Sequence, residues 1–86
     1  MFKKISLSDA LKILTTDKSA RKDVYFAISS KVVNEYNTTN EDLLDNGTRV
    51  PCVRVDCGMI YGDIKSYIYD LASKSLFGGI YVRKEA

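Results

Sequence analysis

The stretch Arg49–Arg83 decides the fold and reads RVPCVRVDCGMIYGDIKSYIYDLASKSLFGGIYVR. Residue types alternate over Val50–Cys57, which predicts a strand with one buried face. Glycines punctuate a loop at Gly58–Gly62, and apolar residues then recur at helical spacing over Asp63–Phe77. A glycine pair ends that helix, and alternation resumes in a final strand at Gly79–Arg83. The stretch therefore predicts a strand, a helix and a strand in that order.

Upstream of this stretch, the sequence predicts a helix and two further strands. Leu7–Thr15 places apolar residues at helical spacing after a Ser-x-x-Asp start, which is a variant of the capping box. Val24–Ile28 is β-branched and aromatic, which favours a strand, and Phe2–Ile5 is a shorter candidate strand. Lys31–Tyr36 fits both a helical turn and a hairpin strand, so both interpretations stay open.

The middle of the chain predicts an insertion between the second and third strands. Asn37–Asn40 has the composition of a loop, and Glu41–Asp45 predicts a short helical turn closed by Asn46 and Gly47. The order is then β-α-β-(insertion)-β-α-β in one α+β domain, residues 1–86. We expect the split β-α-β, or ferredoxin-like, arrangement, with two helices on one face of an antiparallel sheet. The alternative is a three-stranded antiparallel sheet with helices on one side, in which Phe2–Ile5 is not a strand.

Composition excludes several classes of function. A protein of 86 residues with a net charge of +2 is not an acidic mimic of nucleic acid, and it supports nucleic-acid binding only weakly. No apolar run approaches the roughly 18 residues that span a bilayer. No apolar segment follows the positively charged start, so a signal peptide is not predicted. We therefore expect a cytoplasmic protein with no membrane partner.

The inventory of reactive side chains also argues against catalysis and metal binding. Two cysteines without any histidine cannot form a usual four-ligand zinc site. Cys52 and Cys57 lie on opposite faces of one predicted strand, so we expect no disulfide between them. We expect Cys57 to be a core thiol and Cys52 to be half-exposed. The absence of histidine also removes the commonest general base near neutral pH.

Two candidate reaction sites fail on their chemistry. Gly58–Gly62 lies between a strand and a helix, where a phosphate-binding loop belongs, but it lacks the Walker spacing. Asp63 also places a negative charge at the helix start, where an anion would bind. Asp56, beside Cys57 and near Lys65, is the only arguable acid–base group, and it has no base. We therefore predict that the protein is not an enzyme and needs no cofactor.

Tyrosine and arginine side chains mark the candidate functional surface. If the helices cover the Val/Ile face of the sheet, the opposite face presents Tyr25, Ala27, Cys52, Arg54, Asp56, Tyr81 and Arg83. Tyrosine and arginine are enriched at protein interfaces because they combine large contact area with a polar tip. Tyr69 lies on the helix side opposite the apolar stripe and is a second exposed anchor. The predicted partner-binding residues are Tyr25, Arg54, Tyr69, Tyr81 and Arg83.

These observations predict a non-enzymatic module that binds a partner protein or a second copy of itself. The size and composition also fit a small accessory or inhibitor protein of a phage or mobile element. The alternative is a single-stranded nucleic-acid binder that stacks bases on the tyrosines and uses the basic loop at Lys18, Arg21 and Lys22. The near-neutral net charge favours the first interpretation.

Overall fold

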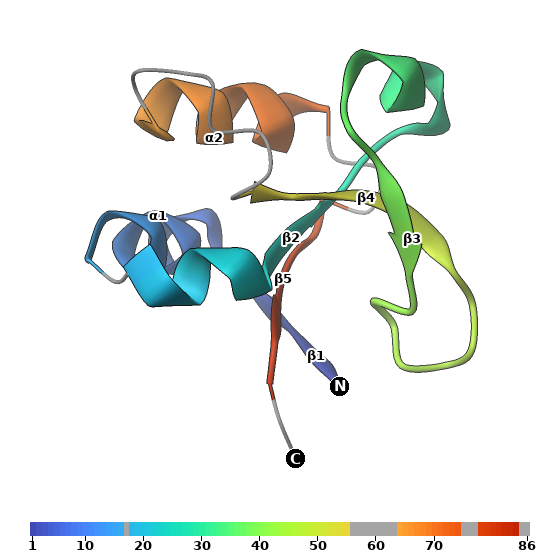
Figure 1. Ribbon diagram of the computed structural model, residues 1–86, viewed down its shortest axis with the longest axis horizontal. Coiled ribbons are helices and arrows are strands. Elements are labelled where there is room, and N and C mark those ends of the chain that lie inside the picture. The colour runs from blue at the N-terminus through green and yellow to red at the C-terminus, as the bar shows by residue number, and fades with distance from the viewer. Residues whose placement is uncertain (17, 56–63, 75–77, 85–86) are drawn as a thin grey trace.

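The computed structural model describes residues 1–16, 18–55, 64–74 and 78–84. Within these ranges the protein has the predicted α+β class, with a five-stranded antiparallel sheet and two α-helices (Figure 1). The strands are β1 (Phe2–Ile5), β2 (Val24–Ala27), β3 (Thr39–Glu41), β4 (Val50–Arg54) and β5 (Ile80–Arg83). The helices are α1 (Leu7–Thr16) and α2 (Ile64–Ser73), and two 3₁₀ helices are η1 (Lys18–Asp23) and η2 (Ser30–Glu35).

The strand order is β1-β5-β2-β4-β3, and all neighbouring strands are antiparallel. In the first strand–helix–strand unit, α1 connects β1 to β2, and β5 lies between these two strands in the sheet. In the second unit, α2 connects β4 to β5, and β2 lies between them. The ferredoxin-like order is not confirmed, because that order places the first strand at the centre of the sheet. The three-stranded alternative is wrong, because the sheet has five strands and Phe2–Ile5 is one of them.

The composition of β1 explains why it lies at an edge. Lys3 and Lys4 are both exposed, and they occupy the middle of a four-residue strand. A central position would bury both ammonium groups, which is costly without partners. Charged side chains on a short edge strand also hinder pairing with another molecule. The centre of the sheet is therefore left to the apolar strands β2 and β5.

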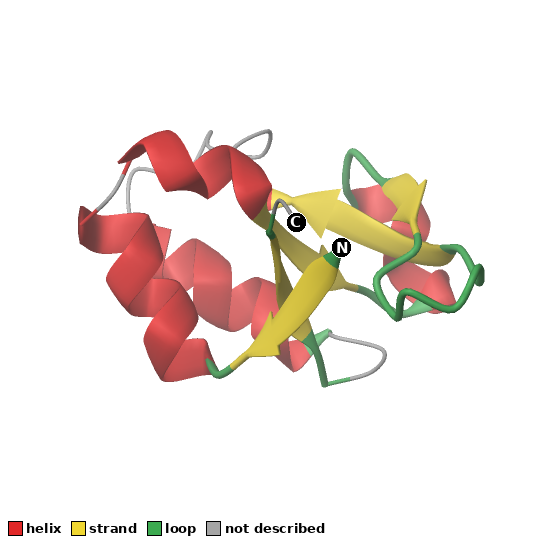
Figure 2. Cartoon of the chain, turned by 90° about the horizontal axis from the view of Figure 1, so that it is seen from below, coloured by secondary structure: helices red, strands yellow, loops and turns green. Residues whose placement is uncertain are grey.

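Both α-helices pack on one face of the sheet, as predicted (Figures 1 and 2). α1 contributes Ala10 and Leu14 to this face, and α2 contributes Tyr67, Ile68 and Leu71. The strand residues in the same cluster are Val24, Phe26, Val53 and Ile80, and Ile28 and Val55 join them just after the ends of β2 and β4. This first face holds the larger apolar cluster, which dominates the stability of a protein this small.

Local sequence signals account for the helices. The Ser6 Oγ accepts the amide N–H of Asp9 at 3.1 Å, which confirms the predicted cap of α1. In α2 the predicted apolar stripe is buried at Tyr67, Ile68 and Leu71. The predicted helix start at Asp63 and helix end at Phe77 lie outside the described residues. No helix in the described ranges has the length and apolar character that crossing a bilayer requires.

The middle of the chain differs from the sequence prediction. Of the open segment Lys31–Tyr36, the first five residues lie in the 3₁₀ helix η2 rather than in a strand, and Tyr36 follows its end with an extended backbone. The expected loop at Asn37–Asn40 and helical turn from Glu41 are wrong in part, because Thr39–Glu41 forms β3 and pairs with Val50–Cys52. All three β3 residues are polar, so the sequence has no apolar alternation that would predict this strand. The strand predicted as Val50–Cys57 ends at Arg54, and Asp56 and Cys57 lie outside the described residues.

A polar cluster ties η2 to the end of α2. The Tyr36 hydroxyl donates to Asp70 Oδ2 at 2.6 Å, and Lys74 Nζ donates to the Tyr36 oxygen at 3.0 Å. Lys74 Nζ also lies 3.6 Å from Asp70 Oδ1, an i,i+4 pair, and 3.3 Å from Glu35 Oε2. Partial burial and the hydrogen bond to Asp70 raise the pKa of Tyr36. The cluster therefore favours the protonated form of the Tyr36 phenol and links η2 to the end of α2.

Leu71 provides the test of the helix layer. The side chain is fully buried, so Leu71→Ala should lower the free energy of unfolding by about 2–5 kcal/mol. Tyr69→Ala is the matched control on the same helix, because Tyr69 is 49% exposed and its loss should change stability by about 0.5 kcal/mol or less. Urea unfolding measures both. A Leu71→Ala loss no larger than the control would show that the stripe of α2 does not face the sheet.

Candidate functional site

The strand register places the predicted Tyr/Arg residues on one face of the sheet. Tyr25 of β2 lies opposite Tyr81 of β5 on one side and Arg54 of β4 on the other. Ala27 lies opposite Cys52, which in turn lies opposite Thr39 of β3. The face therefore carries Tyr25, Ala27, Cys52, Arg54, Tyr81 and Arg83, as expected from the alternation. Asp56, the remaining predicted member, lies outside the described residues.

This second face is covered, which corrects the expectation of an open surface. Tyr25 is only 3% exposed, Tyr81 is 5% exposed, and Cys52 is fully buried rather than half-exposed. Together with Ala27 they form a second apolar cluster with Leu43 and Val50, and Phe2 packs against its border. The insertion between β2 and β4 supplies Leu43. Among the predicted anchors, Arg54, Arg83 and Tyr69 are exposed, whereas Tyr25 and Tyr81 are not.

Short-range hydrogen bonds hold the insertion over the second face. The Asp42 carboxylate accepts the amide N–H groups of Asn46 at 3.0 Å and Gly47 at 2.8 Å. Gly47 and Asp45 have φ values of 85° and 53°, a conformation that glycine adopts freely and aspartate tolerates. Asp45 Oδ2 also accepts the amide N–H of Phe2 at 3.0 Å, which joins the turn to β1. Leu43 therefore lies in a turn between Asp42 and Asp45, whose carboxylates are both held by hydrogen bonds from backbone amides.

Arg83 is part of the packing of this face. Its Nη2 donates to the Tyr25 hydroxyl at 2.9 Å and lies 3.8 Å from Glu41 Oε1. Its guanidinium carbon lies 5.2 Å from the Tyr25 ring centroid and 5.3 Å from that of Phe2. Phe2 and Tyr25 also meet edge to face, with centroids 5.3 Å apart. The cation therefore joins β5, β2 and β3 at the border of the second cluster.

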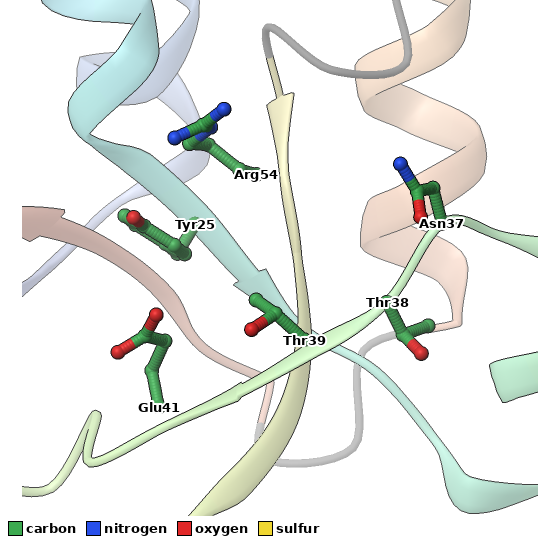
Figure 3. Close-up of a pocket in the computed structure, with 6 residues that line it drawn as sticks. All are labelled: Tyr25, Asn37, Thr38, Thr39, Glu41 and Arg54. Atoms are coloured by element: carbon green, nitrogen blue, oxygen red, sulfur yellow. The ribbon is translucent and has the colours of Figure 1, made fainter.

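A pocket of about 230 Å³ lies beside this arginine (Figure 3). Its lining comes from β2, β4, β3 and the segment that leads into β3. The lining residues are Tyr25, Asn37, Thr38, Thr39, Glu41 and Arg54. In Figure 3 the side chain of Tyr25 lies between those of Arg54 and Glu41. The pocket therefore combines a guanidinium, a carboxylate and a phenol hydroxyl with two further hydroxyls and an amide.

The sequence prediction identified two of the lining residues. Tyr25 and Arg54 line the pocket, and Arg83 contacts two of its lining residues, Tyr25 and Glu41. Tyr81 lies in the buried cluster, and Tyr69 lies on α2, outside the pocket lining. The four residues that the prediction missed are Asn37, Thr38, Thr39 and Glu41. They carry no periodic signal, because they belong to a polar segment whose composition indicated only a loop.

The described residues include no cluster of three His, Cys, Asp or Glu side chains that could hold a metal ion. Comparison with protein-family models, curated proteins and solved structures finds no match to this protein. The chemistry of the pocket must therefore be argued from its own residues.

Cys52 is expected to be unreactive in the folded protein. Burial, with the nearby Glu41 carboxylate, raises the pKa of its thiol to about 11, so the reactive thiolate is scarce at neutral pH. In a Cys57→Ser variant, Cys52 is the only thiol, because the sequence has two cysteines. We expect iodoacetamide to leave it unlabelled in native buffer at about pH 8 and to label it fully in urea. Rapid stoichiometric labelling of the folded variant, measured by intact mass, would contradict the covered second face.

Proposed function

We propose that this protein is a small non-catalytic binding module that holds a partner protein through the pocket beside β3. The observation that carries the proposal is the meeting of Arg54, Glu41 and the Tyr25 hydroxyl in one pocket. The rest of the second face is occupied by the protein's own apolar cluster. Polar groups gathered at the border of a covered face are well placed to orient one group of an incoming molecule.

The size of the pocket favours a partner's side chain over a free organic ligand. Ligand pockets are commonly about 300–1,000 Å³, and this pocket is about 230 Å³. A single inserted anchor residue can carry a large share of the affinity of a protein interface. The partner is a different protein or a second copy of this one. An accessory or inhibitory role in a phage or mobile element remains the biological context that we propose.

The nucleic-acid alternative has lost one of the two features that supported it, the exposed tyrosines, while the basic loop at Lys18, Arg21 and Lys22 remains. Base stacking needs exposed aromatic faces. Tyr25 and Tyr81 are almost fully buried, and the Tyr25 ring already contacts Phe2 and Arg83. We therefore place the binding function in the polar pocket rather than in a stacking platform.

Affinity capture with single substitutions tests the proposal. Arg54→Ala removes the guanidinium from the pocket and should weaken partner capture by about 2 kcal/mol or more. Lys12→Ala is the matched control, because it also removes one positive charge but from the exposed side of α1. Both variants should remain folded by circular dichroism, since exposed side chains change stability little. Lysate of the native host, with and without nuclease, supplies the partner, and sedimentation of the purified protein detects self-association.

The expected pattern is specific to the pocket. Wild type and Lys12→Ala should retain the same partner, Arg54→Ala should lose it, and nuclease should have no effect. If Arg54→Ala retains the partner while Tyr69→Ala loses it, the binding surface is the exposed side of α2 and the pocket proposal is wrong. Loss of the partner after nuclease treatment would favour the nucleic-acid alternative instead.

A further inference from the structure

We propose that the group bound in this pocket is a carboxylate, from an acidic side chain or from the free C-terminus of a polypeptide. The inference rests on the proposed function and names the chemistry that the pocket recognises. It is carried by the charges around the pocket and by one buried hydroxyl.

The charges around the pocket favour a single anion. Arg54 and Glu41 line it, and Arg83 lies near Glu41, with Nη2 and Oε1 3.8 Å apart. The negative charge of Glu41 is therefore partly offset by Arg83 of β5, and the remainder still acts on a guest in the pocket. Among these three side chains two are positively charged and one is negatively charged, which favours an anionic guest beside Arg54 over a cationic one. A guanidinium has five N–H donors, so Arg54 can hold a guest in addition to its contacts within the protein.

The Tyr25 hydroxyl supplies the second, independent observation. This hydroxyl accepts a hydrogen bond from Arg83 Nη2 at 2.9 Å, so its own proton is free to be donated. In the part of the chain that the structure describes, no group accepts that proton. Tyr25 is only 3% exposed and lines the pocket. A buried donor without an acceptor is unfavourable, and a carboxylate oxygen in the pocket would satisfy it.

The remaining groups match a carboxylate in shape and charge. A planar guanidinium can hold both carboxylate oxygens at once. The hydroxyls of Thr38 and Thr39 and the amide of Asn37 add neutral donors around the same space. Glu41 disfavours a doubly charged group such as phosphate more than a singly charged one, because its repulsion grows with the charge of the guest. Glu41 therefore acts as a selectivity residue.

Titration of the full-length ¹⁵N-labelled protein with small probes tests the inference by NMR. Sodium acetate should shift the amide signals of Tyr25, Thr39 and Arg54, and acetamide, its neutral counterpart, should not. Acetyl-aspartate with a blocked C-terminus and acetyl-alanine with a free C-terminus compare the two sources of the carboxylate. Inorganic phosphate tests the charge selectivity.

Three substitutions should change acetate affinity in different directions. Arg54→Gln should weaken binding about tenfold or more, because a charged hydrogen bond is lost. Tyr25→Phe should weaken it several-fold by removing the buried donor, while the ring keeps its packing. Glu41→Gln should strengthen binding several-fold, because the repelling charge is removed. An increase in affinity cannot come from general destabilisation, so this variant separates recognition from folding.

Several results would overturn the inference. These are no site-specific shift with acetate, equal binding by Arg54→Gln, tighter binding of phosphate than of acetate, or weaker binding by Glu41→Gln. If carboxylates fail but partner capture still depends on Arg54, the carboxylate inference fails and the proposed function stands. If acetate binds as expected but no partner depends on Arg54, the proposed function fails and the carboxylate site remains.

Discussion

Strand β2 is buried on both of its faces, and the rest of the structure depends on covering it. All four of its residues are buried. Val24 and Phe26 face the two α-helices, whereas Tyr25 and Ala27 face the other side. Two short helices can cover only one face of a small sheet, so the second face must be closed by something else. The insertion that carries Leu43 closes it, and the polar strands β1 and β3 are left as the two edges.

This way of closing the second face determines where binding can occur. An open sheet would have displayed tyrosine and arginine side chains as one broad surface. Instead, Tyr81 is buried, and Arg83 is engaged with Tyr25, Phe2 and Glu41. The polar residues that remain accessible gather next to β3, where Arg54 lines a pocket. Recognition through one inserted group therefore suits this fold better than recognition through a wide flat surface.

The sequence predicts the local elements well because their signals are local. Helical spacing located both α-helices, and alternation with β-branched and aromatic composition located three strands, with Phe2–Ile5 as a candidate fourth. Alternation also placed Tyr25 and Arg54 on one face. The strand order could not be predicted, because the pairing of β1 with β5 joins opposite ends of the sequence. The sequence also does not predict the covering role of Leu43, since Leu43 and Leu44 lie together in a short polar turn without any periodic apolar pattern. Gly79 was interpreted as a helix stop, but a Cβ there would also collide with the Tyr81 ring. The pocket depends on these long-range contacts, so only part of its lining was predicted.

The covering of the second face by Leu43 is the central claim, and it can be measured directly. In a sample with ¹³C-labelled leucine methyl groups, nuclear Overhauser effects report protons within about 5 Å of the Leu43 methyls. We expect cross-peaks from Leu43 to side chains of the second cluster, whose other buried members are Tyr25, Ala27, Val50, Cys52 and Tyr81. Cross-peaks from Leu43 only to its own residue and to water would contradict the claim, because Tyr25 and Tyr81 would then lie on an open face.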